Sequence, residues 1–233
     1  LVFTKKKFVF GRSTLEFAGF EVTPDGYRPP QRILASIRDF PKPKDITGVR
    51  AWFGLVNQVA YAFAQAEVMA PFRDFLKSNP NNMQFWDETM DELFERSKVE
   101  IVRLIHEGVK AFEKNKPTCL ATDWSHTGGV GFTLTQKHCK CKVITPEFGD
   151  GHWKIVLMGS RFAKEAEGRY APVEGEAPAV VYGLQCCKMF VLGHPHLIIT
   201  VDHKPLIKIL NDRSMETIEN PRLLRMKEKT LLY

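Results

Sequence analysis

Three acidic residues are placed where a fold could gather their side chains. Asp123 follows the apolar run in CLATDWS, and Asp202 follows a similar run in HLIITVDH. Each run suits a buried strand, so the two carboxylates would lie at one sheet edge if the strands were neighbours. The alternative is structural, because an aspartate between a strand and a helix often caps that helix, and Asp202 precedes a predicted helix.

The segment between these aspartates predicts a helix over about 174–192 and supplies a third carboxylate. Glu174 and Glu176 are about 200° apart around a helix, so they cannot both face one site. Glu176 shares its face with small and apolar residues that would lie on a sheet, namely Ala179, Val180, Gly183 and Leu184. We therefore select Glu176 and expect Glu174 to lie nearer the solvent.

Three converging carboxylates indicate metal chemistry. Their mutual repulsion would raise the pKa of at least one of them unless cations were bound. Oxygen ligands suit Mg²⁺ or Mn²⁺. Two such ions about 3.5–4 Å apart can activate a water and stabilise the leaving oxygen of a phosphodiester. Spacing alone leaves both the metal site and the helix cap open.

The elements that must position these residues form an α/β unit in the second half of the chain. Its strands are expected over 119–125, 129–136, 153–160 and 196–203. Its helices are expected over about 174–192 and from Lys204 onward.

The first half of the chain predicts a hairpin and a small helical unit. The hairpin is expected over 8–22, with its turn at Gly-Arg-Ser-Thr, followed by turn residues over 23–30. Helices are expected over about 30–39, 45–63, 67–77 and 87–107.

The composition is that of a folded globular protein with a basic balance of charge. Of 233 residues, 44% are hydrophobic and 26% are charged, and the formal net charge is +6. Positive charge favours a polyanion partner through counterion release. No apolar run is long enough to span a membrane, so we expect no membrane partner.

Several longer motifs resemble one known family. They are FAGFEVTPDGYRP, FPKPKDITGVRAWFGLVNQ, LATDWSHTGGVGFTLTQ, SRFAKEAEGRYAPVEGEAPAVV, TVDHKPL and NPRLLRMKEK. Over essentially the whole chain, this pattern resembles the reverse transcriptase–ribonuclease H region of gypsy-type LTR retrotransposons. The most specific pieces are TVDHKPL, the spacing TD-x-S-x-x-G-x-G-x-x-L-x-Q, and Y-x-x-x-E-x-E before an apolar helix.

The resemblance implies a ribonuclease H-like mixed sheet with flanking helices, preceded by a small helical thumb subdomain and a β-hairpin. Residues 1–28 would be the end of the polymerase palm with a primer-grip-like hairpin, 29–115 the thumb and linker, and 116–233 a C-terminally truncated ribonuclease H domain. The fingers and the polymerase's paired aspartates are missing, so we do not expect DNA synthesis. The family's fourth metal-site aspartate would follow Tyr233, so cleavage by this chain alone is an open question.

The resemblance also implies an activity. The parent would be an RNA-directed DNA polymerase, a nucleotidyltransferase, whose ribonuclease H domain is an endonuclease that hydrolyses the RNA strand of RNA–DNA hybrids. Asp123, Glu176 and Asp202 match the family's catalytic metal ligands, with two Mg²⁺ or Mn²⁺ ions and no small-molecule cofactor. The implied partners are the hybrid and the rest of the polyprotein, in a cytoplasmic retroelement particle or in the nucleus.

Pro178 departs from the family's pattern at the start of the long helix. Proline has no backbone N–H and is tolerated only in about the first turn of a helix. We therefore expect this helix to start later than usual, which would displace Glu176. Trp124 is also unusual for the family, and we expect it to pack on the sheet rather than stack on a substrate.

Four residues are candidates for contacts with nucleic acid. Arg28, Arg32 and Arg50 could bind phosphates, because a hybrid would be held mainly through its backbone. His203 could assist product release or cap the next helix, and we favour the cap. Trp52 lies beside Arg50 in the sequence, and we expect it in the core.

Two other hypotheses belong to different classes. One is an inactive or co-opted remnant of a retroelement that binds nucleic acid without cleaving it. The other is a transposase or integrase on the same fold, although the helical unit before the first strand of the α/β unit argues against it.

Overall fold

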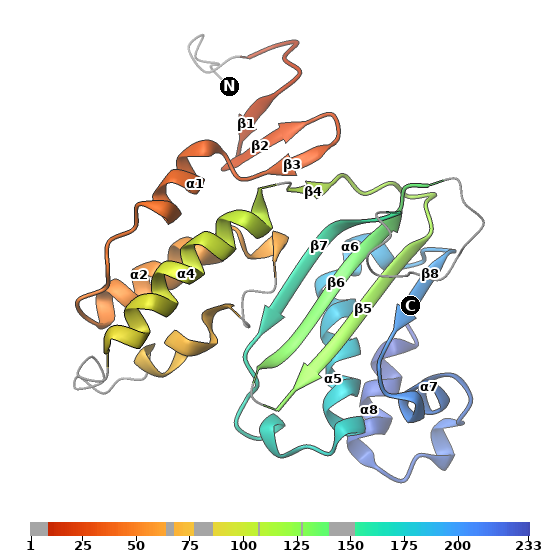
Figure 1. The fold of residues 1–233 in the computed structure, drawn as a ribbon. Helices are drawn as coiled ribbons and strands as arrows, with labels where there is room; N and C mark the ends of the chain where they lie inside the picture. The colour runs from red at the N-terminus through yellow and green to blue at the C-terminus, as the bar shows by residue number, and fades with distance from the viewer. Residues whose placement is uncertain (1–8, 64–67, 77–85, 107, 127, 140–151) are drawn as a thin grey trace, which may run out of the picture.

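The computed structural model describes residues 9–63, 68–76, 86–106, 108–126, 128–139 and 152–233. The chain forms a small sheet with a group of helices, followed by an α/β unit with its own sheet (Figure 1). Each part has its own apolar core. None of the helices in these ranges is long and apolar enough to cross a membrane.

The first sheet is antiparallel and contains the predicted hairpin. Its strands are β1 (Leu15–Phe17), β2 (Phe20–Thr23), β3 (Gly26–Arg28) and β4 (Val109–Lys110). The predicted turn was wrong, because Phe17 pairs with Phe20 and leaves Ala18 and Gly19 as the turn. Their φ angles of 50° and 86° are both positive, as a two-residue type I′ turn requires. Residue 8, the predicted start of the hairpin, lies outside the described residues.

The helical unit packs beside this sheet and confirms most of the predicted helices. It contains α1 (Gln31–Arg38), α2 (Ile46–Asn57), the 3₁₀-helices η2 (Ala60–Ala62) and η3 (Ala70–Leu76), and α4 (Glu88–Ile105). Residues 67 and 77, the predicted ends of the third helix, are not among the described residues. Trp52 is fully buried in the core of this unit, as expected.

Aspartates start the two longest helices of this unit. The side chain of Asp45 accepts a hydrogen bond from the backbone N–H of Gly48 at 2.7 Å. Asp87 accepts one from Met90 at 2.9 Å. Each bond satisfies a backbone donor that the first turn of a helix leaves without a partner.

The second sheet has the strand order β7-β6-β5-β8 and is mixed, as predicted. Its strands are β5 (Thr118–Ser125), β6 (Gly129–Lys137), β7 (Trp153–Arg161) and β8 (Leu197–Thr200). The first three run antiparallel in chain order, whereas β8 runs parallel to β5. This arrangement places the carboxyl ends of β5 and β8 at the same edge of the sheet.

The helix α5 (Pro172–Cys186) lies along one face of this sheet (Figure 1). The other helical elements of this part are η5 (Glu167–Arg169), α6 (Lys188–Val191), α7 (Lys204–Asn211), η6 (Met215–Thr217) and α8 (Pro221–Thr230). Between the sheet and α5, the fully buried side chains of Leu120, Leu134, Val180 and Leu184 form the core.

The expected late start of α5 was wrong. The helix begins at Pro172, and Pro178 lies in its second turn. Pro172 suits the first helical position, where a backbone N–H would have no helical partner. Glu174 accepts a hydrogen bond from the backbone N–H of Ala171 at 3.4 Å, which also favours this start. Pro178 therefore removes one helical hydrogen bond, but packing of α5 on the sheet outweighs that loss.

Candidate metal centre

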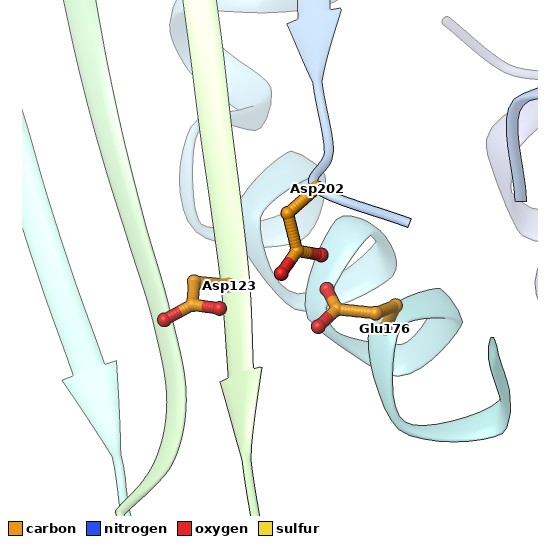
Figure 2. Close-up of side chains that lie close together, drawn as sticks. All are labelled: Asp123, Glu176 and Asp202. Atoms are coloured by element: carbon orange, nitrogen blue, oxygen red, sulfur yellow. The ribbon is translucent and has the colours of Figure 1, made fainter. Parts of the chain in front are cut away.

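Asp123 and Asp202 lie where β5 and β8 separate. The last register pair between these parallel strands joins Ala121 to Thr200. Each aspartate follows its member of that pair by two residues. The two carboxylates therefore reach the same edge of the sheet, as the sequence predicted, and Figure 2 shows them converging there.

The third carboxylate comes from the second turn of α5. Glu176 points from this helix toward both aspartates (Figure 2). One carboxylate oxygen from each of the three residues lies within 4.8 Å of the other two. Only 3% of Glu176 is exposed, whereas Asp123 and Asp202 are open to solvent. The predicted convergence of these three side chains is confirmed.

The electrostatics of the cluster act mainly on Glu176. Its pKa is raised to about 8, first by burial and then by the negative charges of Asp202 and Asp123, while a backbone hydrogen bond from Trp124 opposes the shift. The Oε2 atom of Glu176 is buried and has no hydrogen-bond partner. Because an ionised carboxylate oxygen without a donor is costly to bury, this position favours a bound proton or a bound cation.

Glu174 does not join the cluster. Its Oε1 accepts hydrogen bonds from Asn220 at 2.8 Å and from Arg222 at 2.9 Å. The bond from Asn220 is the largest cause of a lowered pKa at Glu174. Geometry thus confirms the choice of Glu176, but Glu174 ties α5 to α8 instead of pointing freely into solvent.

The cluster fits a hard divalent cation. All of its donors are carboxylate oxygens, which Mg²⁺ and Mn²⁺ prefer. One carboxylate oxygen from each of the three residues lies within 4.8 Å of the other two, so the three residues could hold a common cation. A cation would also give the unpartnered oxygen of Glu176 a ligand bond. In the described part of the chain, no second group of three His, Cys, Asp or Glu side chains gathers in this way.

Comparison with protein families finds one family whose profile covers the acidic cluster. The profile of the RNase H-like domain found in reverse transcriptase matches residues 113–233, just over half of the chain. The chain belongs to this family. All three residues of the cluster lie inside the matched range.

The sequence relatives of this RNase H-like chain are polyproteins of LTR retrotransposons. It is 26% identical over 221 residues to the retrovirus-related Pol polyprotein from transposon gypsy of Drosophila melanogaster, covering 91% of this chain and 20% of that polyprotein. It is 24% identical over 228 residues to the transposon Tf2-3 polyprotein of Schizosaccharomyces pombe, covering 97% and 16%. The chain therefore spans about a fifth or less of these relatives, and the predicted resemblance to gypsy-type elements is confirmed.

Solved structures share the fold of this RNase H-like chain. The foamy viral protease-reverse transcriptase in complex with RNA/DNA hybrid has a TM-score of 0.68 at 14% identity, covering 94% of this chain and 28% of the viral one. A second structure of that viral protein, in complex with double-stranded DNA, has a TM-score of 0.66, also at 14% identity, covering 95% and 36%. The shared fold thus includes the helical unit as well as the RNase H-like domain.

Neither helix-cap interpretation holds at the end of β8. His203 occupies the N-cap position of α7, so Asp202 precedes the cap, and the ring of His203 makes no capping hydrogen bond. The predicted cap by His203 was wrong, because Pro205 at the second position of the helix has no N–H, and the N–H of Leu206 donates to the backbone carbonyl of His203 rather than to its ring. The Nδ1 atom of His203 is buried without a partner. Its contact with nucleic acid stays a prediction.

Trp124 packs on the sheet beside Val130, as predicted, and also against Ala179 of α5. It is 8% exposed, and its ring lies so close to Gly175 that a Cβ atom there would be 2.2 Å from the ring. The glycine therefore lets α5 approach the sheet closely, one residue before Glu176. His126 packs against the same ring, with 4.3 Å between the ring centroids.

The three arginines predicted to bind phosphates belong to the first part of the molecule. Arg50 is exposed on α2. Arg28 on β3 and Arg32 on α1 are also exposed, but they hold ion pairs of 2.8 and 2.6 Å with carboxylates of the hairpin, those of Glu21 and Glu16. The structure does not bring these arginines into the acidic cluster, and their phosphate contacts stay predictions.

Sequence reasoning missed an ion pair in the loop before α5. Arg161, at the end of β7, donates to both carboxylate oxygens of Glu167 at 2.6 and 2.8 Å. Glu167 is 8% exposed. Opposite charges six residues apart in a predicted loop are too common to single out, so only the tertiary structure reveals this contact.

Proposed function

We propose that this chain comes from the thumb and ribonuclease H region of a retroelement reverse transcriptase, and that the ribonuclease H domain of the intact parent hydrolyses the RNA strand of RNA–DNA hybrids with two divalent cations, Mg²⁺ or Mn²⁺. The observation that carries this proposal is the convergence of three carboxylates, one of them buried and raised in pKa, within 4.8 Å. Family membership and the RNA/DNA hybrid in the related viral structure support it.

Asp123, Glu176 and Asp202 would hold the cations. Bound there, two cations would lower the pKa of an attacking water and stabilise the leaving oxygen of the phosphodiester. The edge of the sheet fixes Asp123 and Asp202, while packing of α5 on Trp124 fixes the approach of Glu176. The two aspartates form the exposed side of the cluster, so a phosphate would approach from that side.

The wider assignments belong to the same proposal. Residues 1–28 would be the end of a palm, 29–115 a thumb and linker, and 116–233 the ribonuclease H domain of a longer polyprotein. Arg28, Arg32, Arg50 and His203 would contact the hybrid, and the net charge of +6 favours such a partner. The parent polyprotein would act as an endonuclease and nucleotidyltransferase in a cytoplasmic retroelement particle or in the nucleus.

The test is cleavage of an RNA–DNA hybrid labelled on the RNA strand, with Mg²⁺ or Mn²⁺, by the wild-type chain and by Asp202→Asn. We expect the wild type to cut the RNA strand only when the cation is present, and the variant to lose at least about 100-fold in rate, because it removes a charged metal ligand. Asp212→Asn is the matched control, since Asp212 is an exposed aspartate at the end of α7. Equal cleavage by the wild type and Asp202→Asn would contradict the metal role.

The inactive-remnant hypothesis is decided in the same assay. A hybrid-binding measurement by fluorescence anisotropy would accompany the cleavage time course. Tight binding of the hybrid with no cleavage in either cation would favour a remnant that binds nucleic acid without hydrolysing it.

A further inference from the structure

Arg73 of the helical unit contacts the RNase H-like domain at the loop that follows β7. Its Nη2 atom donates to the backbone carbonyl of Ala163 at 2.9 Å, across 90 positions of sequence. Its guanidinium carbon also lies 4.6 Å from the centre of the Phe162 ring. One arginine on η3 thus makes a hydrogen bond and a cation–π contact with two successive residues of the loop that follows β7.

Phe162 belongs to the core of the helical unit rather than to the core beside its own sheet. It packs against the buried cluster that contains Trp52, and its ring is 6.4 Å from that of Phe53 on α2. Ala163 next to it is 7% exposed. The partly buried Phe162 and the buried Ala163 therefore lie at the contact between the two parts of the molecule, which we call the 162–163 joint.

The other side of this joint contacts β6, the strand that pairs with β5, on which Asp123 lies. Gly129, the first residue of β6, has a φ of +118° and is buried. A Cβ atom there would lie 2.1 Å from the carbonyl oxygen of Arg161 and 2.7 Å from the backbone nitrogen of Ala163. The start of β6, where Gly129 pairs with Ser125 two residues beyond Asp123, thus packs directly on the 162–163 joint, with no side chain between them.

The same joint leads into the helix that carries Glu176. Beyond it, Glu167 accepts from Arg161 through both carboxylate oxygens and from the backbone N–H of Lys164 at 2.8 Å. These bonds connect the two ends of the loop between Arg161 and Glu167. The helix η5 begins at Glu167, and α5 begins three residues after η5 ends. The guanidinium of Arg161 also lies 5.2 Å from the ring centre of Tyr182 on α5. The joint is therefore connected to Glu176 through a loop that is held by the paired side chains of Arg161 and Glu167.

We propose that Arg73 is a positioning residue for the metal centre. By fixing the 162–163 joint against the helical unit, it sets the approach of α5 to β5, and hence the spacing of Glu176 and Asp123. This inference rests on the proposed function. It adds that the helical unit is part of the catalytic apparatus, because one of its side chains holds the carboxylates at metal-binding distance without contacting substrate or cation.

The experiment compares Arg73→Ala with Arg73→Lys and with Arg103→Ala in the full chain. Lysine keeps a donor for the Ala163 carbonyl and a cation over Phe162, so it should rescue most of the effect. Arg103 is an exposed arginine of the same unit whose ion pair, with Glu100, stays within α4. Three quantities are measured: Mn²⁺ affinity by calorimetry, kcat and KM on the hybrid, and hydrogen exchange over residues 162–176.

We expect Arg73→Ala to weaken Mn²⁺ affinity and lower kcat by roughly 5- to 20-fold, since residues that orient metal ligands have effects of this order. KM for the hybrid should stay unchanged, and hydrogen exchange should accelerate over 162–176. A role in stability alone would accelerate exchange but leave Mn²⁺ affinity and kcat at wild-type values, and that result would overturn the inference. An equal loss in Arg103→Ala would overturn it as well.

The readouts separate this inference from the proposed function. If the wild-type chain binds Mn²⁺ but cleaves no hybrid, hydrolysis fails, and the Mn²⁺ affinities of the variants still decide the role of Arg73. If the wild-type chain binds no Mn²⁺, both the metal centre and the positioning role are overturned.

Discussion

Asp123 and Asp202 occupy equivalent places on two neighbouring parallel strands, each two residues beyond the Ala121–Thr200 pair. The main-chain pairing between β5 and β8 ends at that point, so the two strands separate where their aspartates begin to face each other (Figure 2). The separation leaves space that backbone hydrogen bonds would otherwise close. Glu176 enters that space from α5. The negative charges of the two aspartates therefore lie close to its carboxylate and raise its pKa.

Removing one of the aspartate charges should stabilise the chain when no metal is present. In Asp202→Asn, the pKa of Glu176 should fall toward its ordinary value, because the charge of Asp202 is one cause of the raised pKa. We expect a higher melting temperature than wild type in EDTA at pH 8, and little further gain on adding millimolar Mg²⁺. Asp212→Asn should follow the wild type in both solutions, and a variant that Mg²⁺ stabilises as strongly as wild type would argue against a shared cation.

The stability of the metal-free chain should fall as the pH rises from about 4.5 to about 8. Over this range the folded chain holds a proton on Glu176 that the unfolded chain has already released, so the free energy of unfolding decreases with pH. The part due to this residue is at most about 5 kcal/mol. Urea denaturation in EDTA at several pH values measures it. Glu176→Gln should lack this decline, and parallel pH curves for the two proteins would refute the assignment.

Pro178→Ala should stabilise the chain by about 1–2 kcal/mol. Alanine restores an N–H that can donate to the carbonyl of Glu174 within α5. The gain is smaller than the full cost of a helical proline because the unfolded chain also regains freedom. Denaturant unfolding provides the measurement. Pro172→Ala is the matched control, since Pro172 starts the same helix and removes no helical bond, and an equal gain there would show that the missing N–H is not the cause.

Gly175→Ala should destabilise the chain by about 2–3 kcal/mol, although alanine favours helices. A Cβ atom at this position would lie 2.2–2.4 Å from ring atoms of Trp124, which neither α5 nor β5 can relieve easily. Gly54→Ala, in α2 with open space around it, should instead be neutral or stabilising. Denaturant unfolding compares the two. Trp124→Leu should recover part of the loss in the double variant, and purely additive effects would show that the ring is not the obstacle.

Much of the metal centre could be predicted from the sequence, because apolar runs mark the strands and the aspartates lie near the ends of those runs. Apolar runs fix where β5 and β8 lie, and each aspartate comes near the end of its run, so both reach one edge once the strands are neighbours. Helical periodicity then separates Glu176 from Glu174, since only one of them shares a face with residues that pack on the sheet.

Other predictions were wrong where tertiary contacts outweighed a preference of the local sequence. Pro178 should end or delay a helix, yet the apolar face of α5 gains more on the sheet than one lost hydrogen bond costs. The hairpin turns at Ala18 and Gly19 because the pairing of Phe17 with Phe20 fixes the register, whereas Gly-Arg-Ser-Thr was the more obvious turn sequence. His203 makes no capping hydrogen bond, because Pro205 has no N–H and the N–H of Leu206 donates to the backbone carbonyl of His203.

The sequence by itself determined the α/β elements and the three acidic side chains, because strand and helix periods are properties of local residue order. Its motifs, through their resemblance to a known family, also determined the family and the mixed sheet. Only the tertiary structure decided that Glu176 is buried with a raised pKa, and that Arg73 holds the loop before α5. Burial and charge repulsion depend on which atoms exclude water around a group, and residues 90 positions apart come into contact only when the whole chain has folded.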